Sequence, residues 1–507
     1  MKFATRAGSS LAVLAATVAA PLAPADYSSD VNAPLVLAAT ANDDVQPKIV
    51  AAPSDGHYIG YLTGAGYDVA LARLDRNGKS AWTGPTIVND RALSSTVDYG
   101  CASDGVNAYL AYATTAGALQ CTAVSPTGAI LWTTVTSAAA GNVPAQVTVA
   151  SDGFVWVAAI EGSGTRVQRL DPATGAASFA TPVQLAETGA SQFIADIEPS
   201  LGGAVIVSCV RYATFSGPKI LRAHRVEPNG TRPWAANGVS VFTTGSLQFG
   251  NFPPFIGDGA GGGYFAWYGT GPLQSYVQRV SATGALLYGT NGVAVTTSTA
   301  GAERTDPSML LGTDGRLYVT FTQHTPNTSI YGIFAQCFAK GVAQWGPTGA
   351  VVEPLGGTYS RGWGRMLRAG SGVAVSYNDA INAVQDNLKC AMLDAAGAVS
   401  SRFDIALNSG SKYRYVAADA VDGGSVLVWQ GGSTGASDVW ASRINDDGTI
   451  GPPPAGVFGD LNGDGVVSAP DIAIMLSQWG GPGSADLVPN GVVDAQDIAA
   501  LLSAWTI

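Results

Sequence analysis

Short runs of apolar, β-branched and aromatic residues recur through residues 33–450, and each run ends near a glycine turn. Such runs are typical of β-strands. No stretch before residue 470 has the apolar spacing of an amphipathic helix. The body of the chain is therefore predicted to be all-β. The clearest strands are expected at 58–62, 108–112, 154–160, 204–210, 264–268, 317–321, 373–377 and 426–429.

These strands belong to a repeat with turn glycines 47 to 57 residues apart. In six of the eight units an aromatic residue follows the glycine by four positions, and in most units an Asp-Gly pair marks an earlier turn. Short strands in a repeat of this length predict a β-propeller with one four-stranded blade per unit. We expect eight blades, because seven would require one unit to be degenerate. The glycines are Gly78, Gly128, Gly175, Gly230, Gly284, Gly341, Gly397 and Gly448, and the aromatics are Trp82, Trp132, Phe179, Trp234, Tyr288 and Trp345.

The two ends of the repeat region predict how the ring closes. The eighth unit stops after its third strand, at 438–444, and runs into a Pro/Gly linker at 451–458. Residues 34–39 precede the first unit and resemble the fourth strand of the other units. We expect this N-terminal strand to complete the eighth blade, which would leave no open sheet edge.

The short turns are expected on one face of the disc and variable loops on the other, at 63–67, 114–118, 161–165, 211–218, 269–275, 322–330, 377–387 and 431–437. Binding residues concentrate on loops that a rigid scaffold positions. Side chains there could stack on a sugar ring or simply pack their own loop: Tyr212, Phe215, Tyr268, Tyr276, His324 and Tyr377. Acids there could form a catalytic carboxylate pair or simply be solvated: Glu161, Glu303, Asp306, Asp379 and Asp386.

The turn segments 75–82 and 170–179 resemble the docking motif of quinoprotein-type propeller repeats. The resemblance implies that the aromatic residue locks neighbouring blades together. It does not imply a quinone cofactor, since the chain has no adjacent cysteine pair to help hold one. A sialidase Asp-box fits less well, because the Gly-to-Trp spacing is one residue too long. Arginines that recur near the end of the third strand are expected to support the scaffold rather than bind anions: Arg73, Arg169, Arg225, Arg279 and Arg443.

The last fifty residues contain two copies of an oxygen-rich loop that is followed by a short amphipathic helix. Donors at positions 1, 3, 5, 9 and 12, with Gly465 at position 6, are typical of a calcium-binding loop. Val488 stands where the second loop should supply an oxygen, so the second site is predicted to be weaker or completed by water. The expected Ca²⁺ ligands are Asp460, Asn462, Asp464, the Val466 carbonyl, Ser468 and Asp471, and then Asp486, Asn490, the Val492 carbonyl, Asp494 and Asp497.

Residues 459–507 resemble the type I dockerin, in which a calcium loop and one helix are duplicated and Asp occupies position 12. The resemblance implies a small all-α, EF-hand-like domain that binds a cohesin domain and attaches a secreted protein to a scaffold. Positions 10 and 11 depart from the hydroxyl residues common in cohesin-binding dockerins: they are Ala469-Pro470 and Ala495-Gln496. This departure leaves the calcium prediction intact and the identity of the partner open.

Residues 1–25 have the basic start, the apolar run and the Ala-Pro-Ala end of a secretory signal peptide, so we expect a secreted or cell-surface protein. A net charge of −11 argues against a nucleic-acid partner. No other apolar stretch is long enough to span a bilayer. Five scattered cysteines predict no disulfide framework, and three separated histidines predict neither a catalytic triad nor a zinc site.

The leading functional hypothesis is a non-catalytic secreted protein. Its propeller would bind a glycan or protein ligand, and its dockerin-like module would attach it to a cohesin-like partner or the cell surface. The alternative is a polysaccharide-degrading glycoside hydrolase or lyase that its dockerin localises. A surface-layer or adhesion component, with the module as a retention tag, is a third possibility.

Overall fold

The computed structural model describes residues 26–505 except 139, 142, 249, 299–300, 357–358, 371, 421–422, 434, 454–458, 463–465, 482 and 489–491. Residues 1–25, most of the expected linker, and the expected calcium ligands Asp464 and Asn490 therefore lie outside the described residues.

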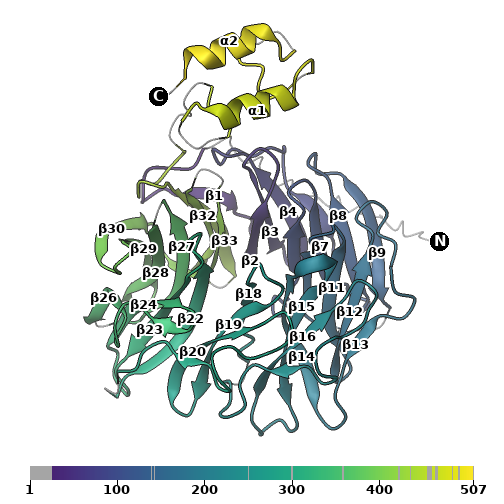
Figure 1. The fold of residues 1–507 in the computed structure, drawn as a ribbon, viewed down its shortest axis with the longest axis vertical. Coiled ribbons are helices and arrows are strands. Elements are labelled where there is room, and N and C mark those ends of the chain that lie inside the picture. Colours follow the sequence, from purple (N-terminus) through teal and green to yellow (C-terminus); the bar gives the residue numbers. More distant parts are fainter. Residues whose placement is uncertain are drawn as a thin grey trace, which may run out of the picture.

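The described residues form eight separate antiparallel sheets arranged in a ring (Figure 1). The prediction of an eight-bladed β-propeller is therefore confirmed. Blade 6 has five strands because β25 and β26 both pair with β24, and the other blades have four.

The bounds of the strands follow the chain around the ring. Blades 1 to 4 consist of β2 (Val45–Ala51), β3 (His57–Thr63), β4 (Asp68–Leu74) and β5 (Thr86–Asn89); β6 (Gly100–Ser103), β7 (Ala108–Ala113), β8 (Leu119–Val124) and β9 (Ile130–Ser137); β10 (Ala145–Val149), β11 (Val155–Glu161), β12 (Gly164–Leu170) and β13 (Val183–Leu185); and β14 (Ser191–Pro199), β15 (Val205–Tyr212), β16 (Ile220–Val226) and β17 (Val239–Ser240), with the 3₁₀ helix η1 (Leu201–Gly203) after β14.

Blades 5 to 8 continue in the same way. They consist of β18 (Phe255–Gly257), β19 (Gly263–Thr270), β20 (Leu273–Val280) and β21 (Val293–Ala294); β22 (Glu303–Leu311), β23 (Leu317–His324), β24 (Tyr331–Ala339), β25 (Val342–Ala343) and β26 (Ala350–Gly356); β27 (Arg361–Ala369), β28 (Gly372–Asn382), β29 (Gln385–Leu393) and β30 (Val399–Ala406); and β31 (Ser411–Asp419), β32 (Ser425–Ser433) and β33 (Ala436–Ile444) with β1 (Leu35–Ala38).

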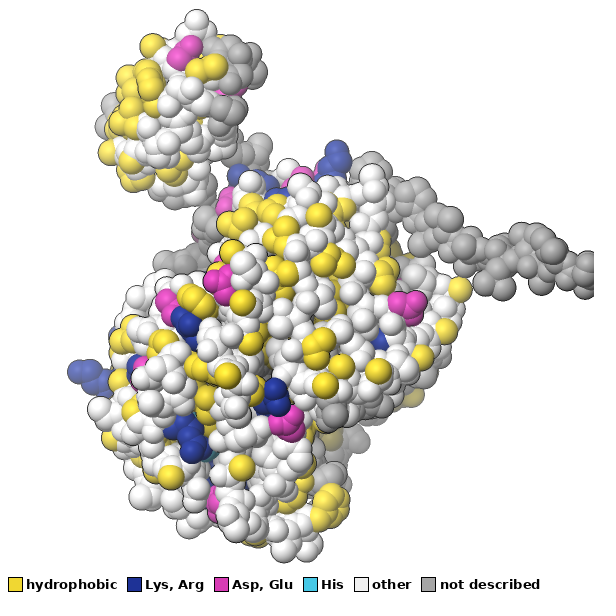
Figure 2. Space-filling view, turned by 90° about the vertical axis from the view of Figure 1, so that its right-hand side faces the viewer, with side chains coloured by type: hydrophobic (Ala, Val, Ile, Leu, Met, Phe, Trp, Pro, Cys, Tyr) yellow, Lys and Arg dark blue, Asp and Glu magenta, His cyan; other side chains and the backbone are white. Residues whose placement is uncertain are grey.

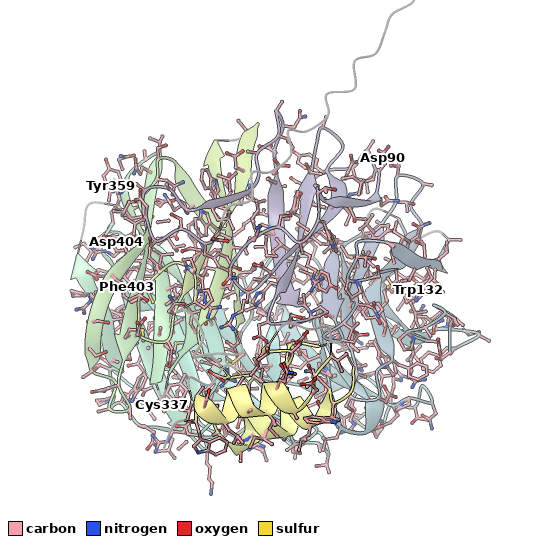
Figure 3. The ribbon with its side chains drawn as sticks, turned by 90° about the horizontal axis from the view of Figure 1, so that it is seen from above. Asp90, Trp132, Cys337, Tyr359, Phe403 and Asp404 are labelled. Carbon is pink, nitrogen blue, oxygen red and sulfur yellow. The ribbon has the colours of Figure 1, made fainter. Side chains whose placement is uncertain are left out.

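The strand β1 closes the ring, as the sequence predicts. It pairs antiparallel with β33, and the eighth sheet has the order β1-β33-β32-β31. The turn after the first strand of a blade and the turn after its third strand lie at the same end of the sheet, because consecutive strands are antiparallel. The loops between blades lie at the other end, where Figure 3 shows Asp90 and Tyr359 near one edge of the molecule. The two predicted faces are therefore those of the structure.

The hydrophobic core lies between the blades. Eight apolar clusters each combine residues of two neighbouring blades, including the pair formed by blades 8 and 1. The first strands of the blades surround a central cavity, which is lined by residues of β2, β10, β14, β18, β22, β27 and β31. The innermost strand of each blade is thus the first one.

An aromatic side chain of one blade packs on the turn glycine of the next. The Trp82 indole N–H donates to the Pro126 carbonyl at 2.9 Å, and a Cβ on Gly128 would lie 3.2 Å from the Trp82 ring. At Gly175 a Cβ would lie 2.6 Å from the Trp132 ring, which only glycine avoids. The same contact recurs at Phe179/Gly230, Trp234/Gly284, Tyr288/Gly341 and Trp345/Gly397.

Tyr27 makes this contact where the last blade meets the first. A Cβ on Gly78 would lie 2.7 Å from the Tyr27 ring, and the Tyr27 amide donates to the Asn77 carbonyl at 2.7 Å. The Tyr27 side chain is buried. It stands outside the repeat, so the sequence pattern did not indicate its role.

The recurring arginines stabilise turns, which matches the scaffold interpretation. Arg169 pairs with Asp152 at 2.7 Å and Arg279 pairs with Asp258 at 2.8 Å, and both acids belong to the Asp-Gly turns. Arg225 donates to the Gly261 carbonyl at 3.0 Å. All five cysteines are free, and four of them are buried, as expected of small apolar side chains.

The C-terminal region contains two short helices, α1 (Ala469–Ser477) and α2 (Ala495–Ser503). They share a small core in which Met475 and Leu501 are buried. Among the described residues, no helix combines the length and the apolar character that spanning a membrane requires.

Tyr27→Ala is expected to lower the free energy of unfolding by about 3–5 kcal/mol, since it empties the contact that joins blades 8 and 1. Tyr27→Phe is the matched control: the Tyr27 hydroxyl is buried without a hydrogen-bond partner among the described residues, so its loss should cost almost nothing. Chemical denaturation of the three proteins measures both effects. An alanine variant as stable as the wild type would show that Tyr27 does not hold the ring closed.

Candidate functional site

Four of the inner strands that surround the central cavity each contain a β-bulge. In β2, β22, β27 and β31 two residues oppose a single residue of the neighbouring strand. Such a β-bulge bends a strand and re-aims a side chain. The bulged pairs are Gln46-Pro47, Asp306-Pro307, Trp363-Gly364 and Arg414-Tyr415.

The first residue of each pair has a left-handed backbone. The φ angle is 57° at Gln46 and 52° at Asp306, Trp363 and Arg414. This conformation is uncommon for a bulky side chain and costs roughly 1–3 kcal/mol. Strain of this kind persists only where the surrounding structure enforces it, and it clusters at functional sites.

Trp363 lies where three cavities meet. It lines a cavity of about 1220 Å³ at blades 7 and 8, a cavity of about 370 Å³ at blades 5 to 7, and the central cavity of about 630 Å³. Its side chain is 49% exposed although it is large and apolar. The Tyr415 hydroxyl lies within hydrogen-bonding distance of two carbonyls that can accept its single proton, that of Trp363 and, at 3.1 Å, that of Ser376. This bonding ties the bulge to the neighbouring strand β28.

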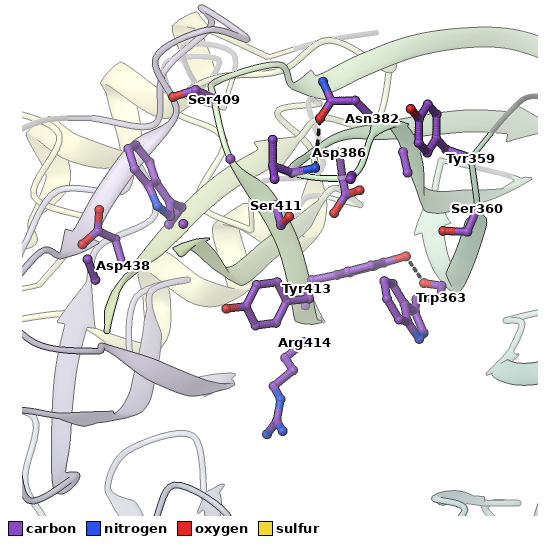
Figure 4. A pocket seen from close by; sticks show the side chains of 18 of the residues that line it. Tyr359, Ser360, Trp363, Asn382, Asp386, Ser409, Ser411, Tyr413, Arg414 and Asp438 are labelled. Atoms are coloured by element: carbon purple, nitrogen blue, oxygen red, sulfur yellow. Dashed lines mark hydrogen bonds between the residues drawn. The ribbon is translucent and has the colours of Figure 1, made fainter. Parts of the chain in front are cut away.

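The largest of these cavities combines aromatic and polar walls. Figure 4 shows Tyr413 and Trp363 on two different strands of the cavity, with Arg414 extending from the strand that carries Tyr413. Tyr359, Trp440 and Arg365 also line this cavity. Polar groups that line the same cavity are Ser360, Asn382, Asp386, Ser409, Ser411 and Asp438.

The smaller cavity at blades 5 to 7 gathers titratable groups. His324 Nε2 lies 2.7 Å from Glu303 Oε2, and the His324 ring stacks on Tyr331. Burial raises the pKa of Asp306 and also that of Asp386. Burial therefore gives this cavity two carboxyl groups with raised pKa values.

Two buried polar atoms of this cavity are unsatisfied within the described residues: Thr322 Oγ1 and Asn378 Oδ1. Both side chains are 2% exposed. An unmade hydrogen bond at such a site costs about 1–3 kcal/mol, so a bound water or ligand group would stabilise it. The cavity is thus built to accept a polar occupant.

The strand β14 carries two carboxyl groups, Asp196 and Glu198, and Asp196 lines the central cavity. Burial raises the pKa of Asp196 to about 6, although the amides of Phe255 and Ile197 donate to its carboxylate. The pKa of Glu198 is raised by its burial and by the charge of Asp196. The two carboxyls of this pair therefore titrate together.

The structure brings together two of the six side chains that the sequence offered for ligand binding. Tyr268 and His324 line the same cavity, where the Tyr268 hydroxyl donates to Gln248 Oε1 at 2.8 Å. Tyr377 is buried and donates to Glu353 Oε2 at 2.9 Å. Tyr276 stacks on Trp267 in blade 5. In blade 4, Tyr212 packs edge-on against Phe193.

Three of the five candidate acids line this cavity, and the other two form ion pairs elsewhere. Glu303, Asp306 and Asp386 line the cavity at blades 5 to 7. Glu161 pairs with Arg166 at 2.9 Å, and Asp379 pairs with Arg361 at 2.7 Å. These ion pairs make Glu161 and Asp379 scaffold residues.

Sequence reasoning missed Trp363, Tyr413 and Arg414, which lie on inner strands rather than in the variable loops. One signal was available at the equivalent positions of blades 1 and 6: a proline follows Gln46 and Asp306. Proline inside a sheet is confined largely to edges and bulges. An alignment of the units on these prolines would have pointed to Trp363 and Arg414.

The carboxylate at position 12 of each C-terminal loop is buried and tied to the backbone. Asp471 accepts from the amides of Leu461, Asn462 and Ser468, at 2.7, 3.0 and 2.8 Å. Burial acts to raise the pKa of Asp471, but these donors hold it below its usual value. Asp497 accepts from Val488 and Asp494 in the same way, both at 2.8 Å.

The other expected calcium ligands precede Asp471 and Asp497 in the sequence of each loop. Among the described residues no group of three acidic, His or Cys side chains converges, and each loop has a central stretch outside them. The donors that are described, Asp460, Asn462, Val466 and Ser468 in the first loop and Asp486, Val492 and Asp494 in the second, are the hard oxygen ligands that calcium prefers. The residues present fit a calcium ion.

The helices of this region expose part of their apolar face. Leu476 in α1 and Trp479, two residues after its end, are 54% and 48% exposed. Leu502 in α2 and Trp505, two residues after its end, are 51% and 39% exposed. Figure 2 shows apolar side chains gathered on one side of this region, at the top of the view. Exposed apolar patches of this kind mark interaction sites.

No protein-family model and no curated protein matches the chain. Among solved structures, an ulvan lyase from a new family of polysaccharide lyases is similar, with 12% identity, a TM-score of 0.45 and coverage of 81% of this chain and 95% of the other. For a thermostable family-43 glycoside hydrolase these values are 11%, 0.32, 50% and 90%. For a prolyl endopeptidase they are 11%, 0.44, 78% and 55%. Similarities this low do not assign a function.

Trp363→Gly is expected to give a protein about 1–2 kcal/mol more stable than Trp363→Ala. Both variants remove the indole, but only alanine keeps the Cβ that disfavours a left-handed backbone. Chemical denaturation of the two variants measures the difference. Equal stabilities would contradict a strained backbone at this bulge.

Proposed function

We propose that this is an exported binding protein whose propeller binds a polysaccharide chain and whose C-terminal region attaches it, in a calcium-dependent manner, to a cohesin-like domain or another surface protein. One observation carries the proposal for the propeller. Trp363 is held half-exposed, in a strained backbone, where three cavities of the molecule meet.

The chemistry of the large cavity fits a carbohydrate. A sugar ring has an apolar face and a rim of hydroxyl groups, so it is bound by aromatic faces with nearby hydrogen-bonding side chains. Trp363 and Tyr413 supply such faces, and Asn382, Ser409 and Ser411 supply polar groups. At about 1220 Å³ the cavity exceeds the usual 300–1,000 Å³ of a small-molecule site, which favours a ligand of several sugar units.

The C-terminal region supports the attachment role. A segment this small has little core, so calcium in the two loops would contribute much of its folding free energy. The folded helices then present Leu476 and Trp479, with Leu502 and Trp505, as apolar positions for a partner. Calcium would thus control whether that partner surface exists.

A second candidate function is polysaccharide cleavage. The observation that favours it is the cavity at blades 5 to 7, which contains Glu303, Asp306 and Asp386 beside His324 and Tyr268. Glycoside hydrolysis needs a carboxyl group with a raised pKa and a second carboxylate. Burial supplies the raised pKa at Asp306 and Asp386.

Titration calorimetry with a panel of soluble polysaccharides tests the proposal. We expect a binding ligand whose affinity falls about tenfold or more in Trp363→Ala, since buried aromatic contacts carry much of such binding energy. Phe215→Ala is the matched control, because Phe215 is 69% exposed and lies outside the three cavities. Binding by no polysaccharide would overturn the proposal. Release of reducing ends or unsaturated products from the same panel would establish the second candidate instead.

Calcium titration of the full chain tests the attachment region. Asp460→Ala and Asp471→Ala are expected to abolish the tighter binding event, and Asp486→Ala to affect only a weaker one. Asp90→Ala, which removes an exposed acid of the propeller, should change neither. A chain that binds no calcium would refute this assignment.

A further inference from the structure

We propose that the polysaccharide is acidic, and that Arg365 and Arg414 bind its carboxylate or sulfate groups in the large cavity. This inference rests on the proposed polysaccharide-binding function and specifies the class of its ligand.

The two arginines lie on neighbouring inner strands that form one wall of the cavity. Arg414 is the first residue of the bulge in β31, and Arg365 follows the bulge in β27. Both line the same cavity as Trp363 and Tyr413. Two cationic side chains and two aromatic side chains therefore line the same large cavity.

Neither guanidinium is neutralised within the described residues. Arg414 is exposed and has no hydrogen bond or ion pair there, and Arg365 donates only to the Gly364 carbonyl, at 3.2 Å. The Arg365 guanidinium also lies 5.4 Å from the centre of the Tyr415 ring. A guanidinium has five N–H donors, so most of the donors in this pair are available to a ligand.

Two other arginines of the propeller are held by several partners. Arg211 pairs with Glu187 at 2.5 Å, and Arg304 donates to Gln274, Gln323 and two carbonyls. In a chain with a net charge of −11, carboxylates are abundant. Arg365 and Arg414 have fewer partners than these two arginines, so their guanidinium donors remain available to an external anion.

Two acids, Asp386 and Asp438, line the same cavity, but neither forms an ion pair with Arg365 or Arg414 within the described residues. Asp386 instead accepts from the Lys412 amide at 3.2 Å. Arg365 lies close enough to Asp306 to lower its pKa, but it forms no ion pair with it.

Backbone strain indicates that the position of Arg414 matters. The left-handed φ of 52° costs stability, and glycine would avoid that cost. Arg414 and the exposed Trp363 line the same cavity. A planar guanidinium fork recognises carboxylate and sulfate oxygens in pairs, while an indole in the same cavity covers a sugar face.

The test compares polymers with the same backbone and different charge. Titration calorimetry on the full chain uses polygalacturonate against its methyl ester, and dextran sulfate against dextran. We expect the charged member of at least one pair to bind tenfold or more tightly than its neutral partner. The two pairs distinguish a carboxylate ligand from a sulfate ligand.

Variants assign the effect to the cavity. Arg365→Gln and Arg414→Gln are each expected to weaken binding of the charged polymer about tenfold. Arg316→Gln is the matched control, because it removes the same charge from an exposed turn on the opposite face. Arg414→Gly removes the guanidinium together with the strain, so it should fold at least as well as the wild type and bind as weakly as Arg414→Gln.

Each outcome decides between the two claims. Equal binding of charged and neutral polymers would overturn the acidic ligand and leave the polysaccharide-binding proposal intact. Equal losses in Arg414→Gln and Arg316→Gln would overturn the role of the cavity arginines, since net charge alone would then explain the preference. Binding of no polymer by the wild type would overturn both claims.

Discussion

The contact between an aromatic ring and a turn glycine supports the whole propeller. A four-stranded sheet has two faces to bury, and here each blade buries them only against its neighbours. The ring stacks closely on the next blade because the glycine has no Cβ, as at Gly175 beneath Trp132. The repeat supplies this contact from blade 1 to blade 7, and Tyr27 supplies it where the ring closes. Between blades 7 and 8, a Cβ on Gly448 would lie 3.4 Å from the Phe403 ring.

A closed ring can hold strained segments that a looser fold would relax. The inner strands carry four left-handed residues, and the surrounding sheets enforce them. Two of the four, Trp363 and Arg414, face the largest cavity. The stable scaffold thus keeps the backbones of Trp363 and Arg414 in conformations that they would otherwise avoid.

The sequence predicted the scaffold well because its signals are local. Strand runs, turn glycines and the strand that became β1 can all be read from neighbouring residues. The bulges could not be read in this way, since a bulge is a property of the register between two strands. Tyr377 shows the same limit, because it was expected where a strand ends and a loop begins, whereas β28 continues to Asn382 and the Tyr377 side chain is buried.

The C-terminal helices illustrate a limit of a different kind. An apolar face was predicted on each helix, and the structure divides it. Met475 and Leu501 fill the small core, while Leu476 and Trp479 stay exposed. Two short helices can cover only a narrow stripe of each other, so periodicity alone did not reveal which part of the face remains outside.

The position of β33 within blade 8 affects how the molecule responds to mechanical load. A pull on the C-terminal region reaches the propeller through β33, which is not an edge strand but lies between β1 and β32. Extracting it would break two hydrogen-bonded ladders together, and one of them belongs to the N-terminal strand. Joining the two ends of the chain in one sheet therefore lets a tethered propeller bear tension without unravelling from its anchored end.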